Sequence, residues 1–376
     1  MPSLDWIVLK VAQRCNLNCT YCYVYNRGDN GWKARPKFIS EVVIRKLAER
    51  IAEHCGRHGL DRFNIEFHGG EPLLLGHERF RAMVELLVAD AHPVRLKFHL
   101  QTNGLLLDPE WVKLFDEFGI SFGISLDGPP ELADQHRVDH RGAGSTHRVV
   151  DNIRTLYSME AFRDSFGGIL AVLMDLDSCS PEALLDWFAD LHVPSIDLLL
   201  PDGNYADPPP GAPAPSRYGD FLIRAFDHWL AMDSTAPNVR LFDHLIRGMW
   251  GEAPSLDSLG GDIGMLCVIE TDGTIGESDV GRICPPLRVD RLSIFSNALE
   301  EHSHASVAAQ SQALCATCLT CPVLHMCGGG YLPHRFDGVS FQNPSYYCEA
   351  LKRLCTHIRD VVLTQVQAAQ RCPVSN

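Results

Sequence analysis

The chain reads Cys15-Asn-Leu-Asn-Cys19-Thr-Tyr-Cys22 directly after the apolar run Trp6-Ile-Val-Leu-Lys-Val11. This pattern predicts a strand followed by a loop with three thiolates. Such thiolates can bind three corners of one cubic 4Fe–4S cluster, which leaves the fourth iron without a protein ligand. An iron with an open position can bind and activate a small molecule, so the triplet indicates catalysis. A zinc knuckle is the alternative, but the next candidate ligands along the chain are His54 and Cys55.

The bulk composition narrows the class of protein. The chain has 376 residues, 45% of them hydrophobic, and a net charge of −14 that argues against a nucleic-acid partner. Its fourteen cysteines follow no apolar signal segment, which favours cytoplasmic thiols and iron–sulfur ligands over a secreted disulfide framework. No apolar run approaches membrane-spanning length, so we expect a cytoplasmic protein with no membrane partner.

Short β-branched or aromatic runs alternate with amphipathic stretches over the first two-thirds of the chain. We expect strands at Ile7–Val11, Phe63–Phe67, Lys97–Gln101, Ser121–Ser125, Gly168–Leu173 and Ile196–Leu200. We expect helices at Glu41–His58, Glu78–Ala91, Pro109–Glu117, Ser145–Tyr157 and Pro181–Leu191. Six β/α repeats predict an α/β fold with a parallel sheet, which can curve into a partial barrel with its site at the strand carboxyl ends.

The composition changes after the sixth predicted strand. Pro201–Pro215 is rich in Pro, Gly and Ala and is predicted to be a loop outside the core. Tyr218–Met232 is amphipathic and predicted to be a helix. Short strands, turns and cysteines are expected from about Gly260, followed by a final helix over Ala350–Ala369.

Three polar motifs follow predicted strands. They read His68-Gly-Gly-Glu71-Pro72, Gln101-Thr102-Asn103-Gly104 and Ser125-Leu-Asp127-Gly128. Paired glycines let the backbone approach a ligand, and a carboxylate such as Glu71 can accept hydrogen bonds from an ammonium group. These residues also have structural interpretations that involve no ligand. The glycines can form an ordinary turn, Ser125 can cap a turn or helix, and Arg137, in the segment after Asp127, can form a surface ion pair.

The cysteine triplet resembles the signature of the radical S-adenosylmethionine (SAM) enzymes, and the resemblance extends over nearly the whole chain. In that family the open iron chelates SAM, and electron transfer cleaves SAM to a 5′-deoxyadenosyl radical. The resemblance implies that Gly69, Gly70 and Glu71 hold the methionine amino group. It also implies SAM contacts for the residues that would lie near its adenine, ribose and carboxylate groups, which are Tyr21, Thr102, Asn103, Ser125, Asp127 and Arg137.

Cysteines near the end of the chain form a second set. Cys318-x2-Cys321-x5-Cys327, with Cys348 after a gap, can supply four thiolates to a further 4Fe–4S cluster. The spacing resembles auxiliary cluster II of the SPASM extension of peptide-modifying radical SAM enzymes. A structural zinc ribbon is the alternative, and Cys315 is a further candidate ligand.

A complete SPASM extension carries another cluster, auxiliary I, which we expect to be absent here. Tyr331 and Ser278 stand at two of its ligand positions, while Cys267 and Cys284 remain candidate ligands or core thiols. The acidic residues near Cys267 are predicted to be solvated, with a role as a base or in peptide docking as the alternative. They are Glu270, Asp272, Glu277 and Asp279.

The resemblance implies three parts of the chain. Residues 1–235 would form the radical SAM partial (β/α)6 TIM-type barrel, and residues 236–310 a bridging, twitch-like region. Residues 311–376 would form the C-terminal cysteine-rich, SPASM-like region with one auxiliary 4Fe–4S cluster and the final helix.

The combined motifs resemble the FxsB-type branch of radical SAM/SPASM maturases. This implies an oxidoreductase that modifies a ribosomally made precursor peptide (RiPP biosynthesis) by joining an aromatic ring to an unactivated carbon in a cyclophane-type macrocycle. Asp202, at the end of the sixth predicted strand, would accept the proton. The alternatives are a thioether or ether link, an epimerisation, or formylglycine formation as in sulfatase maturases. Sulfatase maturases usually have both auxiliary clusters, so Ser278 and Tyr331 argue against that alternative.

The implied partners follow from this chemistry. They are a precursor peptide and a reductant such as flavodoxin or ferredoxin. The peptide would be recognised by the barrel mouth, by the loop Pro201–Pro215, by the C-terminal region or by a separate leader-binding protein. An electron carrier is the non-enzymatic alternative, but such a protein has no use for the Gly-Gly-Glu71 and Ser125 motifs.

Overall fold

The computed structural model describes residues 4–232, 236–253, 256–261, 267–288, 292–305 and 311–371. The chain divides into two compact units, each built from two segments. The first unit comprises Met1–Val172 and Asp262–Ser311, and the second comprises Leu173–Gly261 and Gln312–Asn376. The three-part division expected from the sequence stays a prediction.

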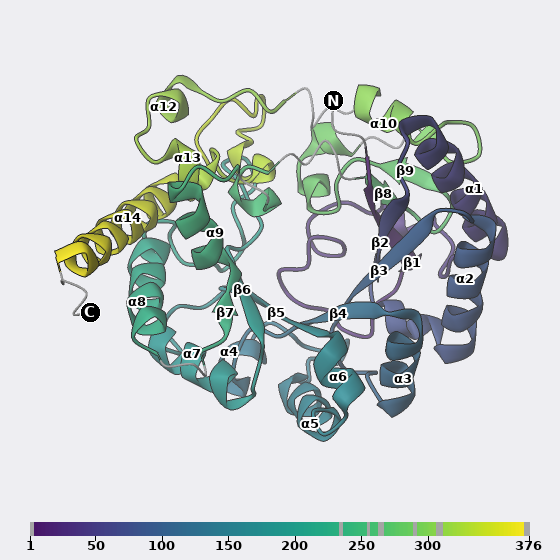
Figure 1. The fold of residues 1–376 in the computed structure, drawn as a ribbon, viewed down its shortest axis with the longest axis horizontal. Coiled ribbons are helices and arrows are strands. Elements are labelled where there is room, and N and C mark those ends of the chain that lie inside the picture. Colours follow the sequence, from purple (N-terminus) through teal and green to yellow (C-terminus); the bar gives the residue numbers. More distant parts are fainter. Residues whose placement is uncertain are drawn as a thin grey trace. The chain divides into compact units, whose positions relative to one another are not determined.

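A parallel sheet forms the centre of the first unit (Figure 1). Its strands β1 (Trp6–Ala12), β2 (Arg62–Gly69), β3 (Arg95–Thr102), β4 (Ile120–Ser125) and β5 (Phe166–Val172) pair in chain order. On the other side of β1 lie β8 (Cys267–Ile269), which is parallel to it, and the antiparallel strands β9 (Thr274–Gly276) and β10 (Leu292–Ser293). The predicted α/β class with a parallel sheet is confirmed.

Capping residues and glycines mark ends of helices in the first unit. They are α1 (Glu41–His58), α2 (His77–Asp90), α3 (Pro109–Phe118), α4 (Pro130–Ala133), α5 (Thr146–Leu156), α6 (Glu160–Ser165) and α10 (Glu300–Ala305). The Asp108 carboxylate caps α3 by accepting the amides of Glu110 and Trp111 at 2.9 and 3.0 Å. Gly59 ends α1 in the left-handed conformation, with φ 67°.

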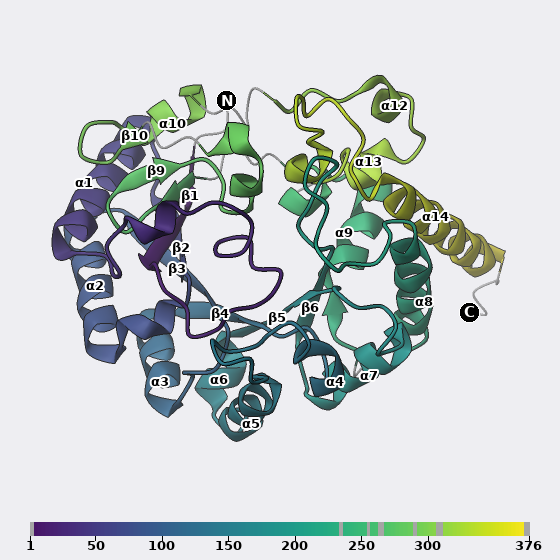
Figure 2. The same ribbon diagram turned by 180° about the vertical axis from the view of Figure 1, so that it is seen from behind.

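Aromatic side chains fill the layer between this sheet and its helices. The rings of Phe67 and Phe98 stack with centroids 5.3 Å apart, and Trp111 meets Phe80 edge-on at 5.3 Å. All four side chains are buried, which anchors α2 and α3 to β2 and β3. The segment between β1 and α1 lies on the opposite side of the sheet from these helices (Figure 2).

The second unit contains the parallel pair β6 (Ser195–Leu199) and β7 (Asn238–Val239). Its helices are α7 (Pro181–Asp190), α8 (Arg217–Ala231), α9 (Arg240–Met249), α12 (Ala316–Leu319), α13 (Leu324–Cys327) and α14 (Cys348–Arg371). Helix α14 packs on α8 and α9, and α13 packs on α9. Short 3-10 turns lie at Gly31–Lys33, Pro72–Leu75, Asp257–Leu259, Val280–Ile283, Pro285–Leu287 and Leu332–Arg335.

The proline-rich residues 201–215 contain no helix or strand, as predicted. Part of this loop is nevertheless buried in the core. Asn204 is fully buried, and its Oδ1 accepts the amides of Ala206 and Asp207 at 3.0 and 2.8 Å. This side-chain turn satisfies backbone groups that a buried loop would otherwise leave unpaired.

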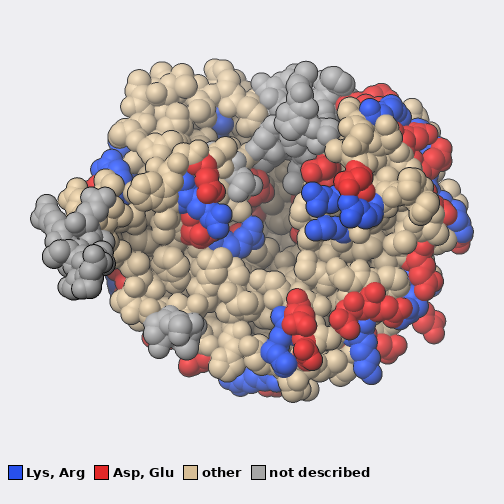
Figure 3. All heavy atoms as spheres, in the orientation of Figure 1, with Lys and Arg blue, Asp and Glu red and all other residues tan. Residues whose placement is uncertain are grey.

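Charged side chains of both signs lie beside one another on the face drawn in Figure 3. Among the described helices, none is long and apolar enough to cross a bilayer.

Candidate active site and cysteine clusters

Residues 13–26, the cysteine loop, leave the carboxyl end of β1 and carry the predicted triplet. The three thiols are half-buried. Burial raises the pKa of the Cys15 thiol to about 12 and that of the Cys22 thiol to about 11. Thiolates in this setting need a cation to stabilise them, and the irons of a cluster supply that charge.

The Gly-Gly-Glu motif packs against the backbone at the start of the cysteine loop. The Gly70 amide donates to the Ala12 carbonyl at 2.8 Å, and the Glu71 amide donates to the Arg14 carbonyl at 2.9 Å. A β-carbon at Gly69 would lie 2.2 Å from the Ala12 carbonyl oxygen. The paired glycines are therefore required for close backbone packing immediately before Cys15.

Replacing Gly70 with alanine should displace the cysteine loop. The added methyl group would lie 2.0 Å from the Tyr25 hydroxyl oxygen and 2.4 Å from the Arg14 carbonyl oxygen. We expect SAM cleavage to fall on the order of 100-fold, because small displacements of reacting groups have such effects. Gly56→Ala in α1 is the control, since a β-carbon there meets nothing within 4 Å. Equal rates of SAM cleavage in the two variants would contradict this role of Gly70.

Glu71 is buried beneath the cysteine loop and accepts three hydrogen bonds. The donors are the Leu73 amide at 3.0 Å, the Thr102 hydroxyl at 2.7 Å and the Asn103 amide at 2.8 Å. Burial nevertheless raises the pKa of Glu71 to about 7. A carboxylate held in this way is prepared to receive a cationic group such as the ammonium of SAM.

Asn103 joins this carboxylate to the cysteine loop. Its Nδ2 donates to Asn16 Oδ1 at 2.7 Å and contacts Cys15 Sγ at 3.7 Å. Ser125 lies at the end of β4, where its hydroxyl accepts from Gln101 Nε2 at 2.8 Å. The structure therefore brings four of the predicted residues together at the carboxyl ends of β1 to β3. They are Cys15, Glu71, Thr102 and Asn103.

Tyr21, Asp127 and Arg137 form a hydrogen-bonded group in which Asp127 and Arg137 are buried and Tyr21 is half-buried. The Tyr21 hydroxyl donates to Asp127 Oδ2 at 2.7 Å and accepts from Arg137 Nη1 at 2.9 Å. The sequence assigned each residue separately to SAM, whereas the structure shows that they hold one another. Their SAM contacts stay predictions, and their observed role is to fix the middle of the cysteine loop.

The sequence missed the segment that lines the cysteine loop after Asp127. The Thr20 amide donates to the His136 carbonyl at 3.0 Å, and the Asn18 amide donates to the Val138 carbonyl at 2.8 Å. The His140 ring also lies 2.9 Å from the Cys15 carbonyl. No local signal marks these residues, because their role depends on pairing across more than a hundred positions of chain.

A polar pocket adjoins the cysteine loop in the first unit. Asp279 pairs with Lys10, accepts from the Tyr23 hydroxyl at 2.5 Å and lies 3.4 Å from His68 Nδ1. Tyr23 directly follows Cys22, and His68 directly precedes Gly69. Burial raises the pKa of Asp279, but the charges of Lys10 and His68 and the hydrogen bonds from Lys10 and Tyr23 together outweigh burial, so the net pKa is lowered and the carboxylate is ionised.

The prediction that the acidic group near Cys267 is solvated is wrong for three of its members. Glu270, Glu277 and Asp279 are buried, and only Asp272 is partly exposed. Polar and basic partners explain this difference for two of them, since Gln13 and Arg35 face Glu270 and Lys10 faces Asp279. A composition argument cannot see such partners, because they come from the opposite end of the chain.

The second set of cysteines gathers in the second unit. The Cys318 thiol, whose pKa burial raises to about 12, interacts electrostatically with the thiols of Cys315, Cys327 and Cys348. The Cys327 thiol interacts with those of Cys321 and Cys348. The predicted ligands are thus brought together, and Cys315 accompanies them. Four or five convergent thiols fit an auxiliary iron–sulfur cluster.

The three glycines after Cys327 make a tight turn. Gly328, Gly329 and Gly330 have φ angles of 57°, 89° and 75°. A β-carbon at Gly329 would also lie 2.4 Å from Leu314 Cδ2. This left-handed run is open only to glycine without strain.

The absence of auxiliary I stays a prediction, and the structure shows the surroundings of its candidate residues. The Ser278 hydroxyl accepts the Gly281 amide at 3.1 Å, and the Tyr331 ring packs edge-on against His334 at 5.2 Å. Cys267 is fully buried in β8, where burial alone raises the pKa of its thiol to about 12, and Cys284 is buried as well. Asp202, the predicted base, lies in the second unit with its Oδ1 3.9 Å from His334 Nε2.

Comparisons with known proteins agree with this arrangement. The family model of the Radical SAM superfamily matches residues 9–185. A cysteine-type anaerobic sulfatase-maturating enzyme of Clostridium novyi is 27% identical over 291 residues, which cover 74% of this chain and 74% of that protein. A serine-type anaerobic sulfatase-maturating enzyme of Bacteroides thetaiotaomicron is 26% identical over 377 residues and covers 94% of this chain and 88% of its own length.

Solved structures share the fold. The structure of anSMEcpe with bound AdoMet has a TM-score of 0.82 at 21% identity and covers 96% of this chain and 99% of that chain. The same enzyme has been solved with AdoMet and the Cp18Cys peptide, with a TM-score of 0.81. The cysteine loop, the Gly-Gly-Glu71 support and these matches lead to one conclusion. Residues 9–185 match the radical SAM superfamily, and the protein is an enzyme that uses a 4Fe–4S cluster and SAM.

Proposed function

We propose that this enzyme oxidises a serine or cysteine side chain of a peptide segment to formylglycine. The observation that carries the proposal is the extent of the match to sulfatase-maturating enzymes, which reaches 94% of this chain and 88% of the serine-type relative. The peptide bound in the anSMEcpe structure supports a peptide as the substrate class here.

The chemistry requires a hydrogen-atom acceptor, a base and an electron acceptor. When bound, the first cluster and SAM supply a radical that takes one hydrogen atom from the β-carbon of the target residue. Conversion of a serine to the aldehyde then requires the loss of one electron and of the hydroxyl proton. For a cysteine, the loss of one electron and of the thiol proton gives a thioaldehyde, which water hydrolyses to the aldehyde with release of hydrogen sulfide. A carboxylate near the cysteine loop can take the proton, and the thiol-bound auxiliary cluster of the second unit can take the electron.

Asp279 is our candidate for that base. It is ionised, buried and hydrogen-bonded to Tyr23, the residue after Cys22. We expect Asp279→Asn to lower aldehyde formation on the order of 100- to 10,000-fold while SAM cleavage continues. Because the neutral amide leaves the Lys10 ammonium unpaired, the double variant Lys10→Met/Asp279→Asn should be measured beside it.

Asp202→Asn is the matched comparison, since the sequence predicted Asp202 as the base. Loss of aldehyde in Asp202→Asn with full activity in Asp279→Asn would assign the base to Asp202. Both rates are measured as product and 5′-deoxyadenosine per chain.

Incubation with peptides tests the function itself. The reduced enzyme is given SAM and a serine- or cysteine-containing sulfatase peptide, and the product is treated with a hydrazine reagent that captures aldehydes. We expect a captured product for at least one of the two residue types. SAM cleavage without any captured aldehyde would contradict formylglycine formation.

Cross-linking of a precursor peptide into a cyclophane-type macrocycle is the second candidate. Ser278 and Tyr331 favour it, because they remove two thiols from the positions of auxiliary I. The precursor peptide encoded beside the gene would then yield a product lighter by two hydrogens that the hydrazine reagent does not capture. The FxsB-type assignment, the reductant and the separate leader-binding protein are part of this second proposal.

A further inference from the structure

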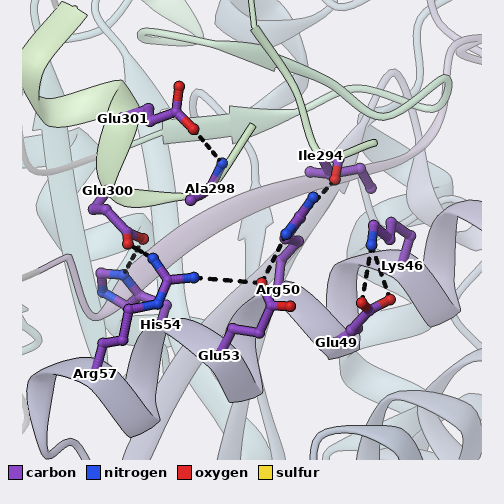
Figure 4. A network of polar contacts seen from close by, with 10 residues as sticks. All are labelled: Lys46, Glu49, Arg50, Glu53, His54, Arg57, Ile294, Ala298, Glu300 and Glu301. Carbon is purple, nitrogen blue, oxygen red and sulfur yellow. Dashed lines mark hydrogen bonds and ion pairs between the residues drawn. The ribbon is translucent and has the colours of Figure 1, made fainter. Parts of the chain in front are cut away.

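A separate group of metal-ligating side chains lies in the first unit, outside every motif described above. It comprises His54 and His58 of α1 and Glu300 of α10. One ligand atom of each lies within 4.8 Å of the others, and no second such group occurs among the described residues. Figure 4 shows His54 and Glu300 facing one another, with Arg57 beside them.

The hydrogen bonds of His54 fix its tautomer. Its Nε2 lies 2.7 Å from the Leu4 carbonyl oxygen, which can only accept, so Nε2 carries the hydrogen. In the neutral ring Nδ1 is then a lone pair, and it faces Glu300 Oε2 at 3.3 Å. Two hydrogen-bond acceptors, His54 Nδ1 and Glu300 Oε2, therefore face each other, and the His54 side chain is only 1% exposed. A cation between them would satisfy both.

The neighbours of this pair complete a donor set. His58 follows His54 by one helical turn, and the two ring centroids lie 4.5 Å apart. The His58 side chain is exposed and can turn toward the pair. Arg57 Nη1 pairs with Glu300 Oε1, and Arg57 Nη2 lies 3.4 Å from Glu53 Oε2, which leaves Glu300 Oε2 directed at His54.

We propose that His54 Nδ1, His58 and Glu300 Oε2 bind one zinc-type divalent metal ion. Two imidazoles and one carboxylate are a common zinc donor set, with water in the fourth position. Donor atoms around such an ion lie roughly 3.4 Å apart, so a small rotation of His58 closes the site. The ion would tie α1 to α10 and is independent of the iron–sulfur chemistry.

The test uses the enzyme with its iron–sulfur clusters reconstituted. After anaerobic dialysis against zinc, we expect one zinc per chain, with X-ray absorption showing Zn–N and Zn–O distances of about 2.0–2.1 Å and no Zn–S distance of about 2.3 Å. His58→Ala should weaken zinc binding at least tenfold. His147→Ala, which changes another exposed histidine, is the control and should leave binding unchanged.

Arg57→Gln should change zinc affinity in the opposite direction from His58→Ala. This difference distinguishes a metal site from an ion-pair network. Removing the guanidinium takes away a repelling charge and frees Glu300 Oε1, so zinc affinity should rise several-fold. Equal zinc content in wild type and His58→Ala, or sulfur in the zinc shell, would overturn the proposal. Weaker zinc binding in Arg57→Gln would overturn it as well.

Discussion

Replacing Cys19 with alanine should abolish SAM cleavage and remove about four irons per chain, because two thiolates do not retain a cubic cluster. The change touches only the cysteine loop, so the auxiliary iron of the second unit should remain. The measurements are iron and sulfide content of the reconstituted protein and 5′-deoxyadenosine formed after reduction.

Cys179→Ala is the matched control for this prediction. Cys179 belongs to neither cysteine set, and its Sγ contacts the Ser180 carbonyl at 3.5 Å. It should keep full iron content and SAM cleavage. Wild-type iron near four per chain would contradict the auxiliary cluster, and iron near twelve would contradict the predicted absence of auxiliary I.

Replacing Glu71 with glutamine should weaken SAM binding by about 10- to 100-fold. The amide removes a charged acceptor, and hydrogen bonds to charged groups contribute about 1.5–3 kcal/mol. Glutamine keeps the side-chain volume, so the Thr102 and Asn103 donors still meet a polar group. Binding is measured by calorimetry with the cluster oxidised, so that SAM is not cleaved.

The same carboxylate predicts the pH dependence of SAM binding. The ionised form of Glu71 is predicted to hold the amino group of SAM, and burial raises the pKa of Glu71 to about 7. Affinity in the wild type should therefore fall as pH decreases below 7, by up to about tenfold per unit. Glu71→Gln should lack this dependence. Glu49→Gln, at an exposed ion pair with Lys46, should retain it.

The strands and helices of the first unit could be predicted because their signals are local. Each predicted strand from Ile7 to Leu173 overlaps an observed one, and Ser40, Asp108 and Gly59 mark helix ends by short-range hydrogen bonds and backbone freedom. The two cysteine sets could also be predicted from the sequence, because the short spacing between their members is typical of the ligands of one cluster.

Other features have no local signal. Asp279 was predicted to be solvated, since an acidic run is usually exposed, yet Lys10 and His68 enclose it from segments more than two hundred positions away. The pairing of residues 136–140 with the cysteine loop was invisible for the same reason. The discontinuous units arise because residues 262–311 add their strands beside β1, which only long-range pairing can decide.

The sequence by itself determined the chemistry available to this protein: three thiolates after a strand, a Gly-Gly-Glu support and a second set of thiolates. These follow from spacing and from residue type, which are properties of the chain. Tertiary structure alone decided the electrostatic state of the groups around them. It buried Glu71 and raised its pKa, tied Tyr21 to Asp127 and Arg137, and kept Asp279 ionised beside Lys10. Burial and distant charges set those states, and both exist only once the chain has folded.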